Sequence, residues 1–282
     1  MPTTDLVIQS PAVGTADLTA IARLAGADGI RVLDGGAQQA YRLPRVRSRT
    51  GIPELCAEAG IDWAFVPTDL TLDRVRVVAF DMDSTLITVE CIDEIADLMG
   101  IKPEVAAITA AAMRGEIDFR ESLVRRVALL RGLPDDALAH VYDERVELSP
   151  GAERMVSGFR AAGAKTLLVS GGFTFFTERL KGRLDIDAAT SNTLEIDDGR
   201  LTGRLIPPIV DAEGKAAHLV SMRRQYAGSG GITVAIGDGA NDLPMLAAAD
   251  VSVAWRAKPL VRAQATCAIN HCGLDAVLNL FA

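Results

Sequence analysis

The feature that most constrains this chain is the acidic segment 81–83 (DMD), which directly follows the apolar run 77–80 (VVAF). An unbroken apolar run is typical of a strand that is buried on both faces of a parallel sheet. Ligands of such sheets bind where the strands end. If the backbone stays extended through the acidic segment, the two-residue period of a strand points Asp81 and Asp83 to the same side. We therefore expect these two carboxylates to share one small cleft.

Two carboxylates in one cleft are suited to two kinds of chemistry. They can bind a divalent cation. One of them can also attack phosphorus and form an aspartyl-phosphate while the other transfers protons. An isolated D-x-D-S-T sequence, however, is more often a polar loop with helix-capping residues, in which Ser84 and Thr85 are small hydroxyl donors. The chemical interpretation therefore depends on matching residues further along the chain.

The composition restricts the class of protein. With 282 residues, of which 49% are hydrophobic, the chain can build one large domain or two smaller ones around a substantial core. A formal charge of -8 disfavours nucleic acid or an anionic membrane as the main partner. No apolar run is long enough to span a bilayer and the first residues lack the features of a signal peptide, so we expect a soluble cytoplasmic protein. The unevenly spaced cysteines are expected to be reduced thiols: Cys56, Cys91, Cys267 and Cys272.

Residues 1–74 are expected to form a separate accessory domain. Their apolar patterns predict helices at 15–24 and 52–59 and strands at 5–9, 30–33, 40–42 and 63–66. The resulting order βαββαβ, with a hairpin turn at 34–36, is typical of a small ferredoxin-like sandwich and is similar to the ACT type, which binds amino acids as regulators. No residue here specifies a ligand. Packing, formation of a homodimer and weak regulation therefore stay open as the role of this domain.

A group of short helices is predicted directly after the acidic segment. Glycines and a Ser-Pro pair end four helical stretches, at 91–99, 103–114, 118–131 and 134–147. Four short helices joined by short loops indicate a helix bundle. Because this bundle interrupts the sheet after its first strand, we expect residues 89–148 to form a cap over the carboxylates. Residues 75–88 and 149–282 would then be the core domain.

The third helix of this bundle contains a candidate substrate contact. Phe119 and Arg126 are seven residues apart and so project from nearly the same face of the helix. None of the residues three or four positions from Arg126 is acidic. An arginine beside an aromatic ring could bind a substrate carboxylate in a bidentate way. A solvated arginine fits the same spacing equally well, so both interpretations stay open.

Three further segments can supply polar groups to the same cleft. The apolar run 165–169 ends in S-G-G at 170–172, whose hydroxyl and amides can bind phosphate oxygens, although most such triplets are turns. The run 232–236 ends in G-D-G-A-N-D at 237–242, which leaves an acid exposed toward the cleft. Between them, Lys215 lies near the start of a helix. It can either be solvated or balance the charge of a phosphate.

The remaining elements complete the alternation of strands and helices. Ser149 and Pro150 are expected to cap and start a helix that runs to Gly163. Asp242 is placed to cap the helix that follows it. The other expected elements are a hairpin at 192–205, a strand at 251–254 and a closing helix at 274–281.

The order of these motifs resembles the haloacid dehalogenase superfamily of phosphatases. D-x-D-S-T, S-G-G, a lone lysine and G-D-G-x-N-D follow one another along the chain. Within that superfamily, the segments 90–95 (ECIDEI), 114–127, 170–173 (SGGF) and 257–259 (AKP) look like those of phosphoserine phosphatases. The resemblance covers about residues 75–282. It implies an α/β fold, with a Rossmann-like core around a parallel sheet and a four-helix-bundle cap inserted after the first core strand.

The resemblance also implies an activity. Phosphoserine phosphatases hydrolyse O-phospho-L-serine to L-serine and phosphate with Mg²⁺, through an aspartyl-phosphate, as the last step of serine biosynthesis. Carried over to this sequence, Asp81 would be the nucleophile. Asp83 would be the general acid and base, and would offer the metal only its main-chain carbonyl. The side chains of Asp81 and Asp238 would bind Mg²⁺, and Asp242 would hold a metal-bound water.

The same resemblance assigns the substrate contacts. The groups that would hold the phosphoryl group belong to Ser170, Gly171, Gly172, Lys215 and Asn241. Glu90 would bind the ammonium group of the substrate and Arg126 its carboxylate. Met113 and Phe119 would close the pocket. The pair of opposite charges favours an amino-acid phosphate over a sugar phosphate.

Three other interpretations stay open at this point. A related phosphatase or phosphotransferase that acts on another amino-acid phosphate would share all the core residues. A non-catalytic amino-acid sensor would not need Asp81, Asp83, Lys215 and Asp238 together. A phosphoacceptor signalling domain also uses acids and a lysine, but it would not need the helical insertion.

Overall fold

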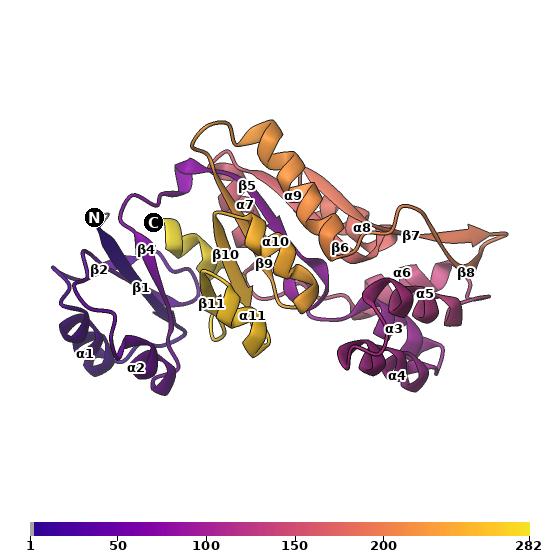
Figure 1. Cartoon of the computed structure of the whole chain (residues 1–282), viewed down its shortest axis with the longest axis horizontal. Helices are drawn as coiled ribbons and strands as arrows, with labels where there is room; N and C mark the ends of the chain where they lie inside the picture. Colours follow the sequence, from indigo (N-terminus) through magenta and orange to yellow (C-terminus); the bar gives the residue numbers. More distant parts are fainter. Residues whose placement is uncertain (1–2) are drawn as a thin grey trace.

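The computed structural model describes residues 3–282, which form two β-sheets and the helices packed on them (Figure 1). The larger sheet has seven strands in the order β11-β10-β9-β5-β6-β7-β8. Neighbouring strands from β11 to β7 are parallel, and β7 pairs with β8 in antiparallel fashion. The strands are β5 (Val75–Phe80), β6 (Lys165–Phe173), β7 (Ala188–Asp197), β8 (Arg200–Ile206), β9 (Ile232–Gly237), β10 (Val251–Trp255) and β11 (Cys267–Ile269). This confirms the α/β fold with a parallel sheet that the sequence predicts.

The strands β9, β5 and β6 lie side by side at the centre of this sheet. Phe80 of β5 pairs with Ile236 of β9 on one side and with Leu168 of β6 on the other. Parallel neighbours end at the same edge of a sheet, so the segments that follow them emerge close together. The three polar motifs are therefore brought to one place.

Helices cover both faces of the larger sheet. Val77 and Ala79 share an apolar core with α9, α10 and α11, whereas Val78 and Phe80 share one with α7, α8 and the last helix of the chain. All four side chains are fully buried, which accounts for an apolar run without alternation. These helices are α7 (Ala152–Ala161), α8 (Thr174–Leu184), α9 (Ala212–Tyr226), α10 (Leu243–Ala248), α11 (Pro259–Gln264) and a 3₁₀ helix, Leu274–Phe281.

Four more helices are inserted between β5 and α7: α3 (Cys91–Leu98), α4 (Lys102–Met113), α5 (Phe119–Leu129) and α6 (Asp136–Arg145). In Figure 1 they form a group below the hairpin of β7 and β8. The hairpin is tied to them by two backbone hydrogen bonds of 2.8 Å, from Gly132 N–H to Leu201 O and from Leu201 N–H to Leu133 O. The hairpin therefore fixes the loop between α5 and α6. The boundaries of core and cap remain a prediction.

Three segments differ from the sequence predictions in their bounds or their geometry. The helix expected to start at Ser149 and Pro150 begins at Ala152, because Gly151 occupies its N-cap with a φ of 81°. β6 does not end before S-G-G but continues through it to Phe173, and its pairing with β7 shifts register after Val169. The closing helix has 3₁₀ geometry.

Among the α-helices and β-strands of residues 3–282, three were not predicted at all: α8, α11 and β11. α11 has 6 residues and β11 has 3, which is too short for a hydrophobic period to be read. α8 contains two threonines and a glycine, which have low helix propensity. Burial of Phe176 and Leu180 in the core outweighs that propensity.

The smaller sheet lies in the N-terminal part of the chain and has the strand order β2-β3-β1-β4. All of its pairs are antiparallel. Leu6 and Ile8 face a core shared with two helices, and Val7, Ala64 and Val66 on the other face join the core of the larger sheet. Its elements are β1 (Thr4–Ser10), α1 (Thr15–Ala25), β2 (Arg31–Leu33), β3 (Gln39–Leu43), α2 (Ile52–Glu58) and β4 (Asp62–Pro67). Its likeness to the ACT type remains a prediction.

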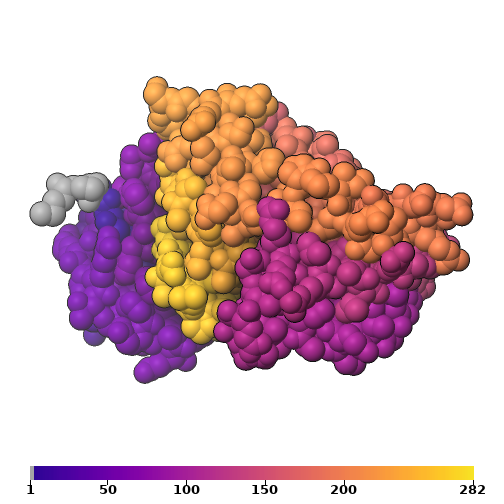
Figure 2. All heavy atoms as spheres, turned by 45° about the vertical axis from the view of Figure 1, so that its right-hand side comes forward, coloured from indigo at the N-terminus to yellow at the C-terminus, as the bar shows by residue number. Residues whose placement is uncertain are grey.

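The smaller sheet is held to the end of the chain by polar contacts. Figure 2 shows the purple part of the N-terminal region packed directly against the yellow C-terminal segment. The buried carboxylate of Asp62 accepts hydrogen bonds from the N–H groups of Asn270, His271 and Cys272, at 2.7, 2.9 and 3.0 Å. Buried Asn279 donates to Gln9 at 2.8 Å. These contacts satisfy polar groups that the packing of the two sheets removes from water.

Two global expectations can be compared with the structure. Within residues 3–282, none of the helices has the length and apolarity needed to cross a membrane. All four cysteines are buried and free, as expected for reduced thiols. Burial raises the pKa of Cys56 and of Cys267 to about 12, so both thiols stay uncharged at neutral pH.

Asp62→Ala tests the importance of the contact between the two sheets. The substitution leaves three N–H groups without their acceptor, which should cost about 3 kcal/mol or more. We expect the midpoint of thermal unfolding to fall by roughly 5–10 °C. Asp69→Ala is the control, because its side chain is 79% exposed and its surface ion pair with Arg74 should contribute less than about 1 kcal/mol. Equal decreases of the unfolding midpoint in the two variants would contradict the stabilising role of the Asp62 contacts.

Candidate active site

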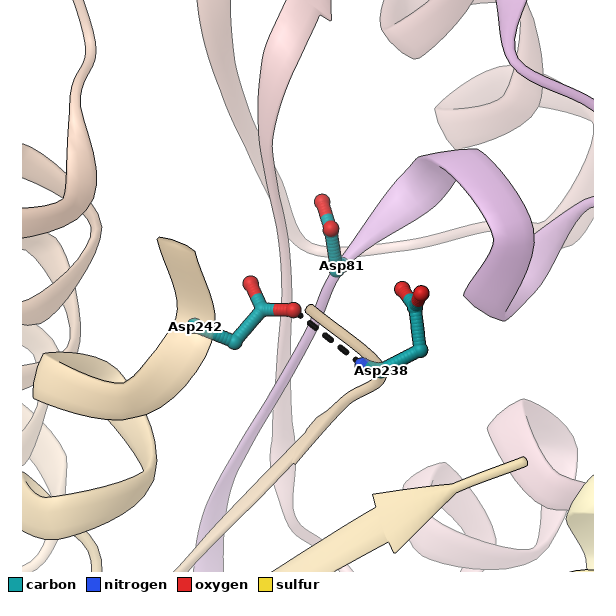
Figure 3. Close-up of side chains that lie close together, drawn as sticks. All are labelled: Asp81, Asp238 and Asp242. Carbon is teal, nitrogen blue, oxygen red and sulfur yellow. Dashed lines mark hydrogen bonds between the residues drawn. The ribbon is translucent and has the colours of Figure 1, made fainter. Parts of the chain in front are cut away.

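Three carboxylates meet where β5 and β9 end. Asp81 follows β5, Asp238 follows β9, and Asp242 lies at the end of the next turn. Each offers one oxygen atom, and these oxygens lie within 4.8 Å of one another (Figure 3). Asp81 and Asp242 are buried, and Asp238 is half-buried. An all-oxygen donor set on three segments is suited to a hard divalent cation.

The buried ammonium group of Lys215, from α9, opposes this negative charge. Its Nζ atom lies 2.8 Å from Asp81 Oδ1 and 2.8 Å from Asp242 Oδ1. Burial would lower the pKa of Lys215, but Asp242 and Asp81 outweigh burial and raise it above its ordinary value. Burial, and next the charge of Asp242, raise the pKa of Asp81 well above its usual range, while Lys215 opposes that rise. One cation therefore leaves the cluster short of positive charge.

The pKa of Asp238 also indicates that the cluster lacks positive charge. Burial and the charge of Asp242 raise its pKa to about 6, although a hydrogen bond of 3.0 Å from Thr85 Oγ1 opposes the rise. A divalent cation between the carboxylates would remove this repulsion. The residues present therefore fit a divalent metal.

Asp83 lies apart from this cluster. Its Oδ1 accepts from the N–H of Cys91 at 2.8 Å, and its Oδ2 lies 3.3 Å from the hydroxyl of Ser170. The sequence argument required an extended backbone, but residues 82–86 form a tight π-type turn, closed by a hydrogen bond from Ile87 N–H to Met82 O at 3.0 Å. That premise was wrong. Asp83 nevertheless faces the same cavity as Asp81, and its own backbone is extended, with φ −65° and ψ 135°.

The cavity has a volume of about 620 Å³ and lies between the strand ends and the helices α3 to α5. Ten of the residues singled out in the sequence line it: Asp81, Asp83, Glu90, Met113, Phe119, Arg126, Gly171, Gly172, Asp238 and Asn241. Three others, Ser170, Lys215 and Asp242, are buried behind this lining. Each of the three contacts a lining residue, which is Asp83, Asp81 and Asp238 respectively.

The two glycines of the S-G-G triplet allow side chains to approach the backbone closely. A Cβ atom at Gly172 would lie 2.7 Å from Asp83 Oδ2, and one at Gly171 would lie 2.9 Å from Cζ of Phe119. Neither distance is tolerated by a real Cβ atom, so larger residues would displace the acid or the ring. The two glycines of the triplet are therefore needed for the close approach of Asp83 and Phe119 to the backbone.

The cap contributes two opposite charges to the cavity. Desolvation, and next the charge of Asp83, raise the pKa of Glu90 to about 7. Solvent reaches this side chain through the cavity, and this limits the rise in its pKa. Burial lowers the pKa of Arg126, and the charges of Asp93 and Glu90 oppose this. Within residues 3–282, Arg126 donates only to its own helix, to Ser122 O at 3.4 Å, and forms no salt bridge. Its guanidinium is thus free to take an anion.

Two contacts in the site were missed by the sequence analysis. Asn192, fully buried in β7, donates to Gly171 O at 2.8 Å and accepts from Val210 N–H at 2.7 Å. Lys258 lines the cavity from the loop before α11. Lys258 stands in the A-K-P segment quoted above, whereas no local pattern marks Asn192.

The expected capping role of Asp242 is wrong. α10 does begin after it, but its side chain makes no capping bond to that helix. Its Oδ2 instead accepts from the N–H groups of Asp238 and Gly239, at 3.1 and 3.0 Å, and the first of these bonds is drawn in Figure 3. The side chain therefore holds the turn that carries Asp238.

Comparisons with known proteins agree with this geometry. The model of the haloacid dehalogenase-like hydrolase family matches residues 78–247, and a domain of unknown function (DUF4072) matches residues 6–52. A phosphoserine phosphatase of Polaromonas sp. strain JS666 is 54% identical over 75% of this chain and 92% of its own length. The unliganded structure of a probable phosphoserine phosphatase from Vibrio cholerae has a TM-score of 0.83 and 36% identity, and the match covers 98% of this chain and 86% of that one. A haloacid dehalogenase family hydrolase from Salmonella enterica serovar Typhi has a TM-score of 0.87 and 34% identity, with 98% of both chains covered.

The carboxylate cluster predicts that a divalent cation stabilises the fold. At a concentration about 100 times its dissociation constant, bound Mg²⁺ should add about 2.7 kcal/mol and so raise the melting temperature by several degrees. Asp238→Asn should abolish most of this shift, since it removes the charge of one of the three clustered carboxylates. Asp93→Asn is the matched control, because Asp93 lines the same cavity outside the cluster. A full shift in Asp238→Asn would argue against the cluster as the metal site.

Proposed function

The chain belongs to the haloacid dehalogenase-like hydrolase family, and from that premise we propose that it is a phosphoserine phosphatase, which hydrolyses O-phospho-L-serine to L-serine and phosphate. The observation that carries this proposal is that Glu90 and Arg126 line the same cavity as Asp81. An amino-acid phosphate has an ammonium group, a carboxylate and a phosphate to match these three residues. A sugar phosphate would leave both charges of the cap without a partner. The relative from Polaromonas sp. strain JS666 is named a phosphoserine phosphatase.

The substrate contacts follow from the lining of the cavity. We propose that Arg126 binds the carboxylate of the substrate and Glu90 its ammonium group, with Met113 and Phe119 as apolar walls. The phosphoryl group would lie against Asp81. Its oxygens would be held by Ser170, the amides of Gly171 and Gly172, Lys215 and Asn241. Two charged contacts and one phosphate contact fix the orientation of the ester.

Two steps then complete the reaction. A carboxylate oxygen of Asp81 attacks phosphorus and forms an aspartyl-phosphate, and the bond from phosphorus to the serine oxygen breaks. Asp83 gives its proton to that oxygen, so L-serine leaves as the neutral alcohol. Asp83 then takes a proton from water, which attacks the phosphorus, releases phosphate and restores Asp81. The raised pKa of Asp83, whose largest cause is burial, favours the proton that the first step needs.

We propose Mg²⁺ as the divalent cation. The side chains of Asp81 and Asp238 and the main-chain carbonyl of Asp83 would hold it, and Asp242 would bind one of its waters. When bound, Mg²⁺ neutralises the negative charge that gathers on the phosphoryl oxygens. Asp83 keeps its side chain for proton transfer, since the Cys91 N–H and the Ser170 hydroxyl hold it away from the cluster.

The remaining proposals concern the setting of the enzyme. Reduced, buried thiols support a cytoplasmic location. The substrate is a small molecule, with no role for nucleic acid or membrane. Residues 1–74 are proposed to act as an accessory domain in packing, in weak regulation or in a homodimer.

The central test measures phosphate release from O-phospho-L-serine with Mg²⁺, beside O-phospho-L-threonine and a sugar phosphate. We expect strong preference for phosphoserine in the native chain. Asp81→Asn should reduce the rate on the order of 10⁴-fold or more, as the loss of a covalent nucleophile does in other hydrolases. Equal rates for the three esters would refute the substrate assignment, and an active Asp81→Asn variant would refute the nucleophile.

The raised pKa of Glu90 predicts a pH-dependent selectivity. Above a pKa of about 7 the carboxylate is ionised and attracts the ammonium group, and below it the attraction is lost. As the pH falls from about 8 to about 6, kcat/KM for phosphoserine should decrease more than kcat/KM for the same ester without its amino group, 3-(phosphonooxy)propanoate. Both esters share the titration of the phosphate, so it cancels in the ratio. Glu90→Gln should make the ratio independent of pH; an unchanged pH profile in that variant would exclude Glu90 as the cause.

A further inference from the structure

Ser84 lies between the general acid and the start of the cap, and it has an unusual backbone conformation. Its φ is 55°, in the left-handed region that glycine adopts without strain and serine rarely does. Backbone strain of this kind clusters at active sites and ligand-binding sites, where the surrounding structure holds the residue in place. The hydroxyl of Ser84 donates to Oε1 of Glu90 at 2.6 Å.

The turn does not depend on that hydroxyl for its shape. Its backbone is closed by hydrogen bonds from Ser84 N–H to Val89 O at 3.2 Å, from Leu86 N–H to Asp81 O at 3.3 Å and from Ile87 N–H to Met82 O at 3.0 Å. The hydroxyl is thus additional to a turn that is already complete.

Glu90 is placed unusually for a residue at the N-cap of a helix. Its side chain makes no capping bond to α3, and the N–H of Cys91, the first residue of that helix, is taken by Asp83. Within the described residues, the side chain of Glu90 accepts one hydrogen bond, from Ser84 to its Oε1 atom, and its Oε2 atom accepts none. One carboxylate oxygen is therefore held, and the other is available to the cavity.

We propose that Ser84 is a positioning residue for amino-group recognition, which holds Glu90 by Oε1 and so presents Oε2 to the ammonium group of the substrate. This inference rests on the proposed function and deepens it. A free glutamate side chain has three rotatable bonds, and fixing it before the substrate arrives reduces the entropy lost on binding. Because Ser84 directly follows Asp83, the same turn also sets the distance between the reacting phosphoryl group and the amino group.

The test compares O-phospho-L-serine with 3-(phosphonooxy)propanoate, which differs from it by the amino group alone. Ser84→Ala removes the hydroxyl, and Ser84→Gly removes it and also relieves the backbone strain. Both variants should raise KM for phosphoserine about 10-fold with little change in kcat, because a hydrogen bond to a charged group typically contributes at least that factor. For the ester without the amino group, kcat/KM should change less than about 2-fold. L-Serine should likewise inhibit both variants about 10-fold more weakly.

Two controls separate this role from a structural one. Thr88→Ala removes an exposed hydroxyl of the same loop, which contacts Glu147 O at 3.5 Å instead of Glu90, and should leave both esters unaffected. In a Glu90→Gln background, Ser84→Ala should add little to the loss already present, since the two residues act as a unit. Additive losses in the double variant would overturn the inference.

The outcomes distinguish this inference from the proposed function. If the native chain does not prefer the ester with the amino group, the proposed function fails and the role of Ser84 fails with it. If the native chain prefers it and both Ser84 variants keep the full preference, the role of Ser84 alone is overturned. Equal loss on both esters would also overturn it, because a distorted turn would then act through Asp83.

Discussion

The site depends on one buried cation among several carboxylates. Lys215 is paired with Asp81 and Asp242, and all three side chains are almost completely removed from water. Charges of one sign can gather in such a place only when opposite charge and hydrogen bonds compensate for the lost solvation. Asp211 helps to fix the lysine, because its side chain caps α9 by accepting from Gly214 N–H at 2.9 Å, one residue before Lys215. The start of α9 therefore determines where the charge that compensates Asp81, the proposed nucleophile, lies in this fold.

The cap is joined through hydrogen bonds, and not through packing alone, to the turn that directly follows Asp81. Asp83 accepts from the first N–H of α3, and Ser84 donates to Glu90, which precedes that helix. Asp83, the proposed general acid and base, and Glu90, the proposed contact of the amino group, are thus held by one short turn. Arg126, by contrast, reaches the cavity from α5, a different helix of the cap. The proposed specificity needs both helices in place, which links selection of the amino acid to assembly of the whole cavity.

The parts of the site that follow from local sequence could be predicted, and the parts that follow from tertiary contacts could not. The apolar run before Asp81 identified a strand end, and a parallel sheet brings such ends together whatever loops connect them. The start of α7 was mispredicted, because the positive φ of Gly151, which places the helix start at Ala152, is not visible in the sequence. Asn192 gave no signal, since its partners Gly171 and Val210 lie 21 and 18 residues away. The roles of the individual site residues remain predictions, because geometry shows where groups lie and only kinetics shows what they do.

The N-terminal sheet is connected to the site only indirectly. Among residues 3–74, none lines the cavity. Asp62 holds the segment that directly follows β11, and β11 pairs with β10. The N–H of Arg256, just after β10, donates to Ile269 O at 2.8 Å, and Lys258 lines the cavity two residues further on. Any influence of the N-terminal sheet on the chemistry along this path therefore acts through the position of β10 and Lys258, since the sheet brings no group of its own to the substrate.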